Sequence, residues 1–395
     1  MGYRQVLGVP EFGALFAADV LSVLGDQVAR LAIALLVYQR TGSAFASTAT
    51  YACSFLTWFV GGPVLSVAAD RYPRRGLMIL CDLGRLVFVL LMCLPGLPLA
   101  LFFAALAVVG LLTPPFEAAR SGLIADIVTG DLYVASNGLT QAMNQAGQVG
   151  GFLFGGVLVA LAGARGALVA DAVTFGMSAV LIATVVRGRP PAQVVETSFV
   201  DDVRTGMTVV FGTPELRRLL AVAALAMAAL IAPEGLAVAI ARSSGAGPVT
   251  AGVLTAAVPA GFVLGAWMVL RVAPDRRIRL LPRLLALACL PLLLTPLTGG
   301  AVPLTALWVL AGAGGGLQVI ANAAFVAAVP ASLRGRAYGV ASTCLMTVQG
   351  GTLLLAGALA ELVGPRMPVA LIAAGVLLAA PLVLGPRGRH AQVPA

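Results

Sequence analysis

The chain alternates between long apolar stretches and short polar segments. A helix of about 20 apolar residues crosses the hydrocarbon core of a bilayer. The runs lack the residue-by-residue alternation of barrel strands, so the pattern predicts helices. The predicted spans are 12–38, 44–68, 77–97, 99–119, 135–160, 166–186, 218–241, 250–271, 281–298, 303–327, 337–362 and 368–385. We therefore expect an all-α polytopic membrane protein with twelve transmembrane helices. Because no small-residue cleavage site follows the first span, we expect a retained helix rather than a signal peptide.

The longest polar stretch, residues 187–217, separates six spans from six spans. Apolar residues recur along it at helical spacing, which predicts an amphipathic helix at the cytoplasmic surface. The residues at this spacing are Phe199, Val203, Met207, Val210 and Phe211. The predicted organisation is an amino-terminal six-helix bundle over 1–190, a linker over 191–217 and a carboxy-terminal bundle over 218–395.

A displacement of 205 positions aligns the two halves of the chain. Asp70-Arg71 then falls on Asp275-Arg276, Tyr133 on Tyr338 and Asn144 on Gln349. Matches at nearly one displacement favour two related bundles around a central cavity that opens alternately to each side.

The composition excludes several enzyme classes. Hydrophobic residues make up 60% of the chain and charged residues 10%, far below the roughly 25% charge of a soluble domain. All 25 basic residues are arginine, and a chain without lysine has no P-loop, kinase or Schiff-base chemistry. The single histidine, His390, lies near the carboxy terminus, and the five cysteines fall in apolar runs without a C-x-x-C pair. We expect no metal and no cofactor.

The arginines indicate the orientation of the chain. With the amino terminus in the cytoplasm, nineteen arginines lie inside, four outside and two within spans. This bias follows the positive-inside rule and accounts for the net charge of +9 without a nucleic-acid partner. The arginine, alanine and glycine usage is typical of a high-GC bacterial genome. We expect a multi-pass protein of the bacterial inner (plasma) membrane, monomeric, with both termini cytoplasmic.

Carboxyl groups inside the spans are the first candidates for ion coupling, because burying a charge in a membrane is costly. Asp19 and Asp26 are seven residues apart on one helix face, and Arg30 lies one turn beyond Asp26. Asp26 is either a protonatable coupling site or the static partner of Arg30. Glu234 follows Pro233 in the seventh span, with no basic residue closer in sequence than Arg242, and is the second coupling candidate.

Other polar residues have expected roles too. Glu117 and Arg120, three apart, form a predicted cytoplasmic gate or structural pair, whereas Asp171 and Glu361 near span ends are expected to be solvated. Amides inside spans either line a substrate cavity or hold helices together. The cavity candidates are Asn137, Gln141, Asn144, Gln148, Gln318, Asn322 and Gln349.

The segment Asp70-Arg-Tyr-Pro-Arg-Arg75, followed by Asp82 and Arg85, resembles the loop signature G-x-x-x-D-R-x-G-R-R of the major facilitator superfamily of transporters. Ser66 and Pro73 replace the two glycines of that signature. The resemblance implies a conformational latch on the cytoplasmic face. Its candidate residues are Asp70, Arg71, Arg74, Arg75, Asp82 and Arg85.

Three further stretches resemble the macrolide-efflux and enterobactin-exporter branch of that superfamily: residues 21–27, 41–43 and 114–120. The fifth span also resembles a glycine-rich antiporter motif, although the proline of that motif is absent. Its glycines either serve a moving interface or only allow tight helix packing. They are Gly147, Gly150, Gly151, Gly155 and Gly156.

These observations predict a drug-exporter-like, proton-coupled antiporter that moves an amphipathic small molecule, such as an antibiotic or secondary metabolite, out of the cell. The partners are this substrate, protons and the lipid bilayer. Proton-coupled or facilitated uptake of a small solute is one alternative. A lipid scramblase or membrane-embedded enzyme is another, although the spans hold no histidine or lysine beside a nucleophile.

Overall fold

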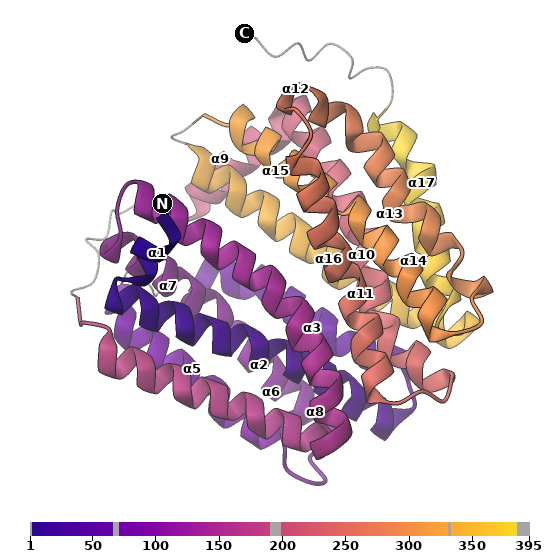
Figure 1. The fold of residues 1–395 in the computed structure, drawn as a ribbon, viewed down its shortest axis with the longest axis horizontal. Helices are drawn as coiled ribbons and strands as arrows, with labels where there is room; N and C mark the ends of the chain where they lie inside the picture. Colours follow the sequence, from indigo (N-terminus) through magenta and orange to yellow (C-terminus); the bar gives the residue numbers. More distant parts are fainter. Residues whose placement is uncertain (1, 66–70, 190–198, 331–332, 385–395) are drawn as a thin grey trace. The chain divides into compact units, whose positions relative to one another are not determined.

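The computed structural model describes residues 2–65, 71–189, 199–330 and 333–384, and in these ranges every regular element is a helix. Short 3₁₀ turns at Ile278–Leu280 and Thr295–Leu297 flank α13. The helices are α1 (Gly2–Leu7), α2 (Pro10–Thr41), α3 (Ala44–Leu65), α5 (Arg74–Met92), α6 (Leu99–Leu111), α7 (Thr113–Ile127), α8 (Asp131–Val185), α9 (Phe199–Gly212), α10 (Pro214–Ser243), α11 (Pro248–Leu270), α12 (Pro274–Arg277), α13 (Leu281–Leu293), α14 (Ala301–Gly314), α15 (Leu317–Ala328), α16 (Arg334–Val363) and α17 (Met367–Leu384) (Figure 1).

The helices account for the twelve predicted spans. Within the described ranges, 9 helical segments are long and apolar enough to cross a membrane, and one of them, 135–185, holds two predicted spans. α3 and α5 lie at the second and third predicted spans. The predicted all-α, twelve-helix fold is confirmed.

The helix α8 reverses direction at Gly163, which has φ 73° and ψ 169°. Gly151, before this residue, lies against Gln27 of α2, while Asp171, after it, lies against Gly25 of α2. A straight helix would separate residues 151 and 171 by about 30 Å. The two halves of α8 are therefore the fifth and sixth spans, joined as a hairpin. Glycine fits the turn because it has no Cβ to oppose a positive φ.

Two spans are interrupted at related positions. α6 ends before Leu112, and the prolines Pro114 and Pro115 begin α7. In the second half, α14 and α15 are separated at Gly315 and Gly316. The two breaks are separated by nearly the displacement of the sequence repeat. The fourth predicted span, 99–119, is thus two helices, and the second extends to Ile127.

The chain divides into two compact units. The first comprises Met1–Gly42, Thr50–Glu196 and Gly247–Gly252, and the second comprises Ser43–Ala49, Thr197–Ala246 and Val253–Ala395. In the first unit α8 packs against α2 and α5, and α5 also packs against α7. An apolar core that includes Phe12, Met78, Phe116 and Leu123 lies where α2, α5 and α7 meet.

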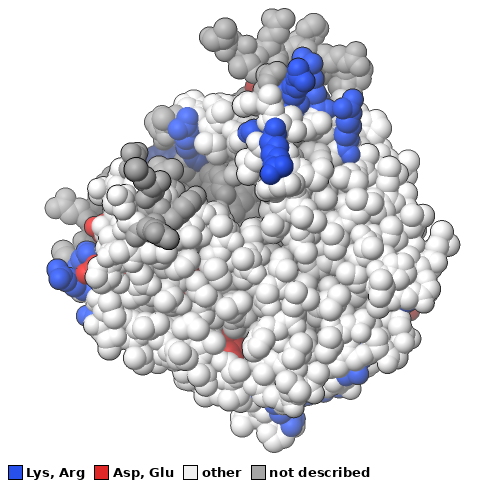
Figure 2. Space-filling model, viewed as in Figure 1, with Lys and Arg blue, Asp and Glu red and all other residues white. Residues whose placement is uncertain are grey.

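In the second unit α10 packs against α16 and α17, and α13 packs against α14. Close backbone approach explains part of this packing, since a Cβ on Gly316 would lie 2.7 Å from the backbone of Gly265. Figure 2 shows a surface dominated by uncharged residues, with arginine side chains gathered around α12. An uncharged surface over long helices is what a lipid environment requires.

Candidate functional site

The first unit buries an ion pair between α2 and α7. Asp19, only 3% exposed, pairs with the guanidinium of Arg120. Arg120 also pairs with Glu117 Oε2 at 2.5 Å, three residues earlier on α7. Asp19 is therefore not an isolated carboxyl group, and its charge is compensated inside the bundle.

A second buried pair lies on α5. Arg85 Nη1 lies 3.6 Å from Asp82 Oδ1. The side chain of Asp82 is 0% exposed and that of Arg85 is 2% exposed. Ser178 Oγ of α8 donates a hydrogen bond of 2.6 Å to Asp82 Oδ2. These contacts fix the rotation of α5 against the sixth span and keep a charged pair away from the apolar surface.

Arg85 is held on several sides. Its Nη2 donates to the carbonyl oxygen of Leu112, at the break between α6 and α7, over 3.1 Å. Its guanidinium carbon lies 4.6 Å from the ring centroid of Phe116 and 5.4 Å from that of Phe175. Cation–π contacts in a dry environment are attractive for a guanidinium. Arg85 is a fixed positive charge in the interior of the unit.

Asp26 lies near the middle of α2 and retains partial exposure. The strongest favourable charge acting on it is Arg85, and Arg30 follows. Arg30 itself lies over the ring of Phe55, 5.7 Å from the centroid. The guanidinium of Arg85, on α5, therefore acts on Asp26 more strongly than that of Arg30 on the same helix.

Asp171 is buried, so the prediction that it is solvated is wrong. This residue was expected to be solvated near a span end, but it is 1% exposed. A Cβ on Gly25 would lie 2.5 Å from Asp171 Oδ1, so its carboxyl group occupies the space beside α2 that a glycine leaves. The rotation of the sixth span causes the difference, because it turns Asp171 toward the space that Gly25 leaves on α2. Glu361, the other acid expected to be solvated, is exposed.

A signal for Asp171 was present in the sequence. Asp171, Thr174 and Ser178 are spaced at i, i+3 and i+7, and this spacing puts them on one face of a helix. A polar stripe within an otherwise apolar span must face protein or water.

The proposed latch residues do not form one group. Arg74 Nη1 pairs with Asp126 Oδ2 of α7 at 2.6 Å, and Arg75 Nη2 donates to the carbonyl oxygen of Ala183 on α8. Arg71 is exposed, and Asp70 lies outside the described residues. Arg74 and Arg75 hold the end of α5 to its neighbours, while Asp82 and Arg85 belong to the buried interior. Asp126 is a partner that sequence reasoning did not assign.

The glycines of the fifth span allow close packing on α2. A Cβ on Gly147 would lie 2.7 Å from Val23 Cγ1, and a Cβ on Gly155 would lie 3.1 Å from Val28 Cα. Gly151 approaches Gln27 in the same way. Gly150 has more room, and Gly156 lies against the 247–252 segment of the same unit.

The amide candidates have different surroundings. Asn137, Gln141 and Asn322 are exposed, and Asn144 and Gln148 are half-buried. In the second unit, Gln318 Nε2 donates to the carbonyl oxygen of Ala223 on α10 over 3.0 Å. Gln349 is buried, and its Nε2 lies 3.4 Å from the carbonyl oxygen of Leu345. The Gln318 bond joins α15 to α10, as polar groups that hold helices together do. The Gln349 bond stays within α16.

Glu234 is 5% exposed on α10, next to Pro233. It is not isolated, because it interacts with other groups in its surroundings. A buried carboxyl group requires such compensation. The second unit therefore also carries an acidic residue within a span.

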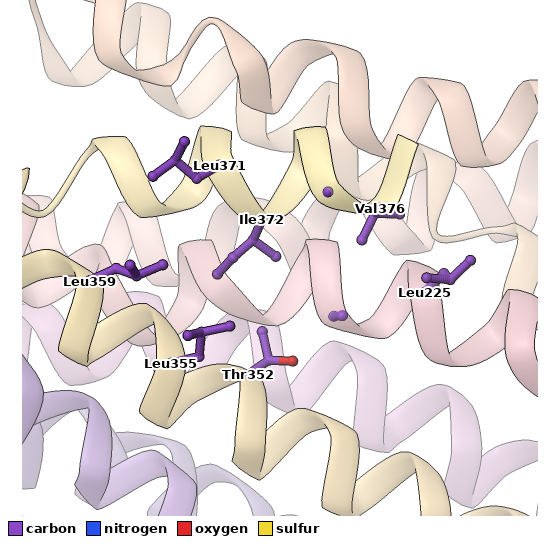
Figure 3. A pocket seen from close by; sticks show the side chains of 9 residues that line it. Leu225, Thr352, Leu355, Leu359, Leu371, Ile372 and Val376 are labelled. Atoms are coloured by element: carbon purple, nitrogen blue, oxygen red, sulfur yellow. The ribbon is translucent and has the colours of Figure 1, made fainter. Parts of the chain in front are cut away.

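An apolar pocket of about 300 Å³ lies in the second unit among α10, α16 and α17 (Figure 3). Leu225, Leu355, Ile372 and other apolar side chains line it, and the hydroxyl of Thr352 is its polar side-chain group. None of the amide candidates is among its lining residues. The apolar lining of this pocket suits a hydrocarbon group of a ligand.

The acidic residues of the first unit suit proton chemistry. No group of three or more His, Cys, Asp or Glu residues within the described ranges has the geometry of a metal site. Instead, the first unit contains buried carboxyl groups in excess of the guanidinium groups around them. Carboxyl groups of this kind can take up and release protons.

Comparison with known proteins identifies the family. The sequence model of the Major Facilitator Superfamily matches residues 15–348. The uncharacterized transporter YfiS of Bacillus subtilis is 26% identical over 386 residues, which cover 92% of this chain and 89% of that protein. The lysophospholipid transporter LplT of Pectobacterium carotovorum is 26% identical over 165 residues, or 42% of this chain and 39% of that protein.

The fold is also similar to that of solved transporters. The inward-facing, occupied structure of a bacterial homologue of the human lysosomal transporter Spinster superposes with a TM-score of 0.76. The superposition covers 97% of both chains at 15% sequence identity. Identity this low supports the fold alone.

Proposed function

Because this chain belongs to the Major Facilitator Superfamily and is a transport protein rather than an enzyme, we propose that it exports an amphipathic small molecule from a bacterial cell in exchange for protons. In this proposal it resides in the inner membrane with both termini in the cytoplasm. Proton entry drives the export, since moving one elementary charge through 100 mV releases about 2.3 kcal/mol.

The position of Asp26 carries this proposal. It is a partly exposed carboxyl group in the middle of a long apolar helix, within electrostatic range of the guanidinium of Arg85. Protonation of Asp26 removes a charge from the bundle and lowers the free energy of a state closed to water. Glu234 gives the second unit a further protonatable group. The Asp19–Arg120–Glu117 set acts at the cytoplasmic end as a gate.

Transport into everted membrane vesicles tests the proposal. Vesicles that carry the protein are energised and given a panel of antibiotics and siderophores, with and without a protonophore. We expect protonophore-sensitive accumulation of at least one compound, and loss of this accumulation in Asp26→Asn. The same substitution at an exposed acid, Asp201→Asn, is the matched control. Normal export by Asp26→Asn would exclude Asp26 as the coupling group, and accumulation only in right-side-out vesicles would favour uptake.

A second candidate substrate class follows from the apolar pocket among α10, α16 and α17. A cavity of about 300 Å³ with one hydroxyl fits an acyl chain, and one relative is a lysophospholipid transporter. The protein would then move a single-chain phospholipid. Fluorescent lysophosphatidylethanolamine added to the same vesicles separates this candidate from export of a soluble drug.

A further inference from the structure

We propose that Asp26 and Asp171 act as one carboxyl pair that holds a single proton between α2 and the sixth span. Asp171 stores the proton in the interior, and Asp26 exchanges it with water. This inference rests on the proposed proton-coupled export and names a second residue of the coupling site.

A glycine lets Asp171 approach α2 directly beside Asp26. A Cβ on Gly25, the residue that precedes Asp26, would lie 2.5 Å from Asp171 Oδ1, and the two acids interact electrostatically. The hydroxyl of Thr174 donates to the backbone carbonyl oxygen of Asp171 over 2.8 Å. Asp171 Oδ1 is buried and has no hydrogen-bond partner of good geometry among the described residues, although the Thr174 hydroxyl lies close and acts favourably on the carboxyl group. A buried carboxylate oxygen without a donor is costly, whereas a shared proton satisfies it.

The helices around the pair do not supply two compensating charges. From α5, Arg85 faces both acids, but it already pairs with Asp82 at 3.6 Å. The thiol at Cys93, just after α5, also lies within electrostatic range of Asp171 and is neutral when protonated.

The remaining charged groups belong to other pairs or lie farther away. Asp19 on α2 and Glu117 on α7 both bind Arg120. Arg30 on α2 acts on Asp26 less strongly than Arg85 does. The positive charge available to the pair is therefore close to that of one guanidinium, and like-charged carboxylates in such a place share one proton.

The difference in exposure gives the two residues different roles. Asp171 is 1% exposed, whereas Asp26 is partly exposed. Release begins when the O–H bond at Asp26 breaks and the proton passes to water. Rebinding of a proton from the other side of the membrane restores the pair. Asp171 itself does not meet water, so it keeps the proton through the occluded state.

Infrared spectroscopy of the full chain in lipid nanodiscs tests the pair without any substrate. A protonated buried carboxyl group gives a C=O band that an ionised one lacks, and difference spectra against the unmodified protein separate the band of the pair from any band of Glu234. At neutral pH we expect this band in the unmodified protein and in Asp201→Asn. We expect its loss in both Asp26→Asn and Asp171→Asn, because the single carboxylate left in each variant is ionised beside Arg85.

Retention of the full band in Asp171→Asn would overturn the proposal, because the proton would then belong to Asp26 alone. Retention in Asp26→Asn would overturn it as well. If Asp171→Asn does not fold, Asp171→Glu replaces it. This variant keeps the acid, so the band is expected to persist at a shifted position, and an unshifted band would contradict sharing.

The outcome is separable from that of the proposed function. If no compound is exported but the band disappears in both variants, the carboxyl pair stands and the exporter proposal fails. If export is protonophore-sensitive and the Asp171→Asn band is unchanged, the exporter stands and the pair fails.

Discussion

The carboxylate of Asp19 on α2 is joined to the guanidinium of Arg120 on α7, and both side chains are less than 10% exposed. These residues are a hundred positions apart in the sequence, so the pair ties the first span to the fourth. An ion pair of this kind stabilises little relative to a well-packed apolar pair, but the loss of one partner leaves a buried charge.

Arg120→Ala is expected to lower the free energy of unfolding by about 3–5 kcal/mol, because the Asp19 carboxylate is then left uncompensated. Thermal unfolding in detergent measures the change. The double variant Asp19→Leu/Arg120→Met should recover most of the stability. Glu117→Gln is the matched control, since the Glu117 side chain is 35% exposed, and its effect should stay below about 1 kcal/mol. Equal losses from Arg120→Ala and Glu117→Gln would contradict this assignment.

Ser178→Ala is expected to destabilise the protein by about 1–3 kcal/mol, because Asp82 loses the hydrogen bond of 2.6 Å that satisfies its Oδ2. The melting temperature in detergent is the measurement. Thr184→Ala on the same helix is the control, because the Thr184 hydroxyl is exposed and donates only to backbone carbonyl oxygens of its own helix. An equal fall in the melting temperature of both variants would show that the hydrogen bond between Ser178 and Asp82 does not stabilise the protein more than a local hydroxyl bond does.

Gly25→Ala is expected to cost about 1–3 kcal/mol, because the added methyl group displaces Asp171 and separates α2 from the sixth span. The same substitution at Gly13 of α2 meets only the carbonyl oxygen of Leu7 at an ordinary 3.5 Å. Gly13→Ala should therefore be neutral or slightly stabilising. The free energy of unfolding of both variants is measured in parallel. An unchanged value for Gly25→Ala would mean that α2 and α8 do not approach as closely as described.

Gly375→Leu is expected to reduce transport of fluorescent lysophosphatidylethanolamine if the apolar pocket holds an acyl chain. Gly375 lines this pocket, and a Cβ there meets no atom within 4 Å, so the larger side chain extends into open space. Gly351→Leu on α16 is the control, because a Cβ at Gly351 also meets nothing within 4 Å and the residue does not line the pocket. Equal lipid transport by both variants would exclude the pocket as an acyl site.

Arg74→Asp is expected to slow transport with little effect on stability. The pair with Asp126 is partly exposed, and such pairs contribute about 0–1 kcal/mol to folding. We expect the pair to act instead on the equilibrium between the conformations of the transport cycle, which is the role of the proposed latch. The charge-exchanged variant Arg74→Asp/Asp126→Arg should restore the transport rate. A double variant as slow as Arg74→Asp would show that the pair itself does not set the rate.

Hydropathy was sufficient to predict the spans and the fold class. The hydrocarbon core of a bilayer imposes both length and apolarity on each crossing segment, so the pattern carries this information locally. Where the sequence reasoning was less accurate, the cause was local backbone geometry. The break before Pro114 lies inside the predicted span 99–119, which hydropathy treats as one continuous segment. The reversal at Gly163, by contrast, lies in the interval between the predicted spans 135–160 and 166–186.

The partners within the site could not be predicted from spacing. Whether Asp171 faces lipid, water or α2 depends on the rotation of one helix against another, which is set by contacts such as that between Gly25 and Asp171. The pairing of Arg74 with Asp126 likewise joins residues far apart in sequence. Pairs close in sequence could be predicted, as the pair of Glu117 and Arg120, three residues apart, shows.

The turn at Gly163 has a mechanical consequence. A connection of so few residues leaves no slack between the fifth and sixth spans, so neither can slide along the membrane normal without the other. Asn144 on one arm and Asp171 on the other must then be displaced together, which ties events at the amide stripe to events at the buried acid. Lengthening this connection with a flexible insert would let the two arms move independently, and in the proposed exchanger this would uncouple substrate movement from proton movement.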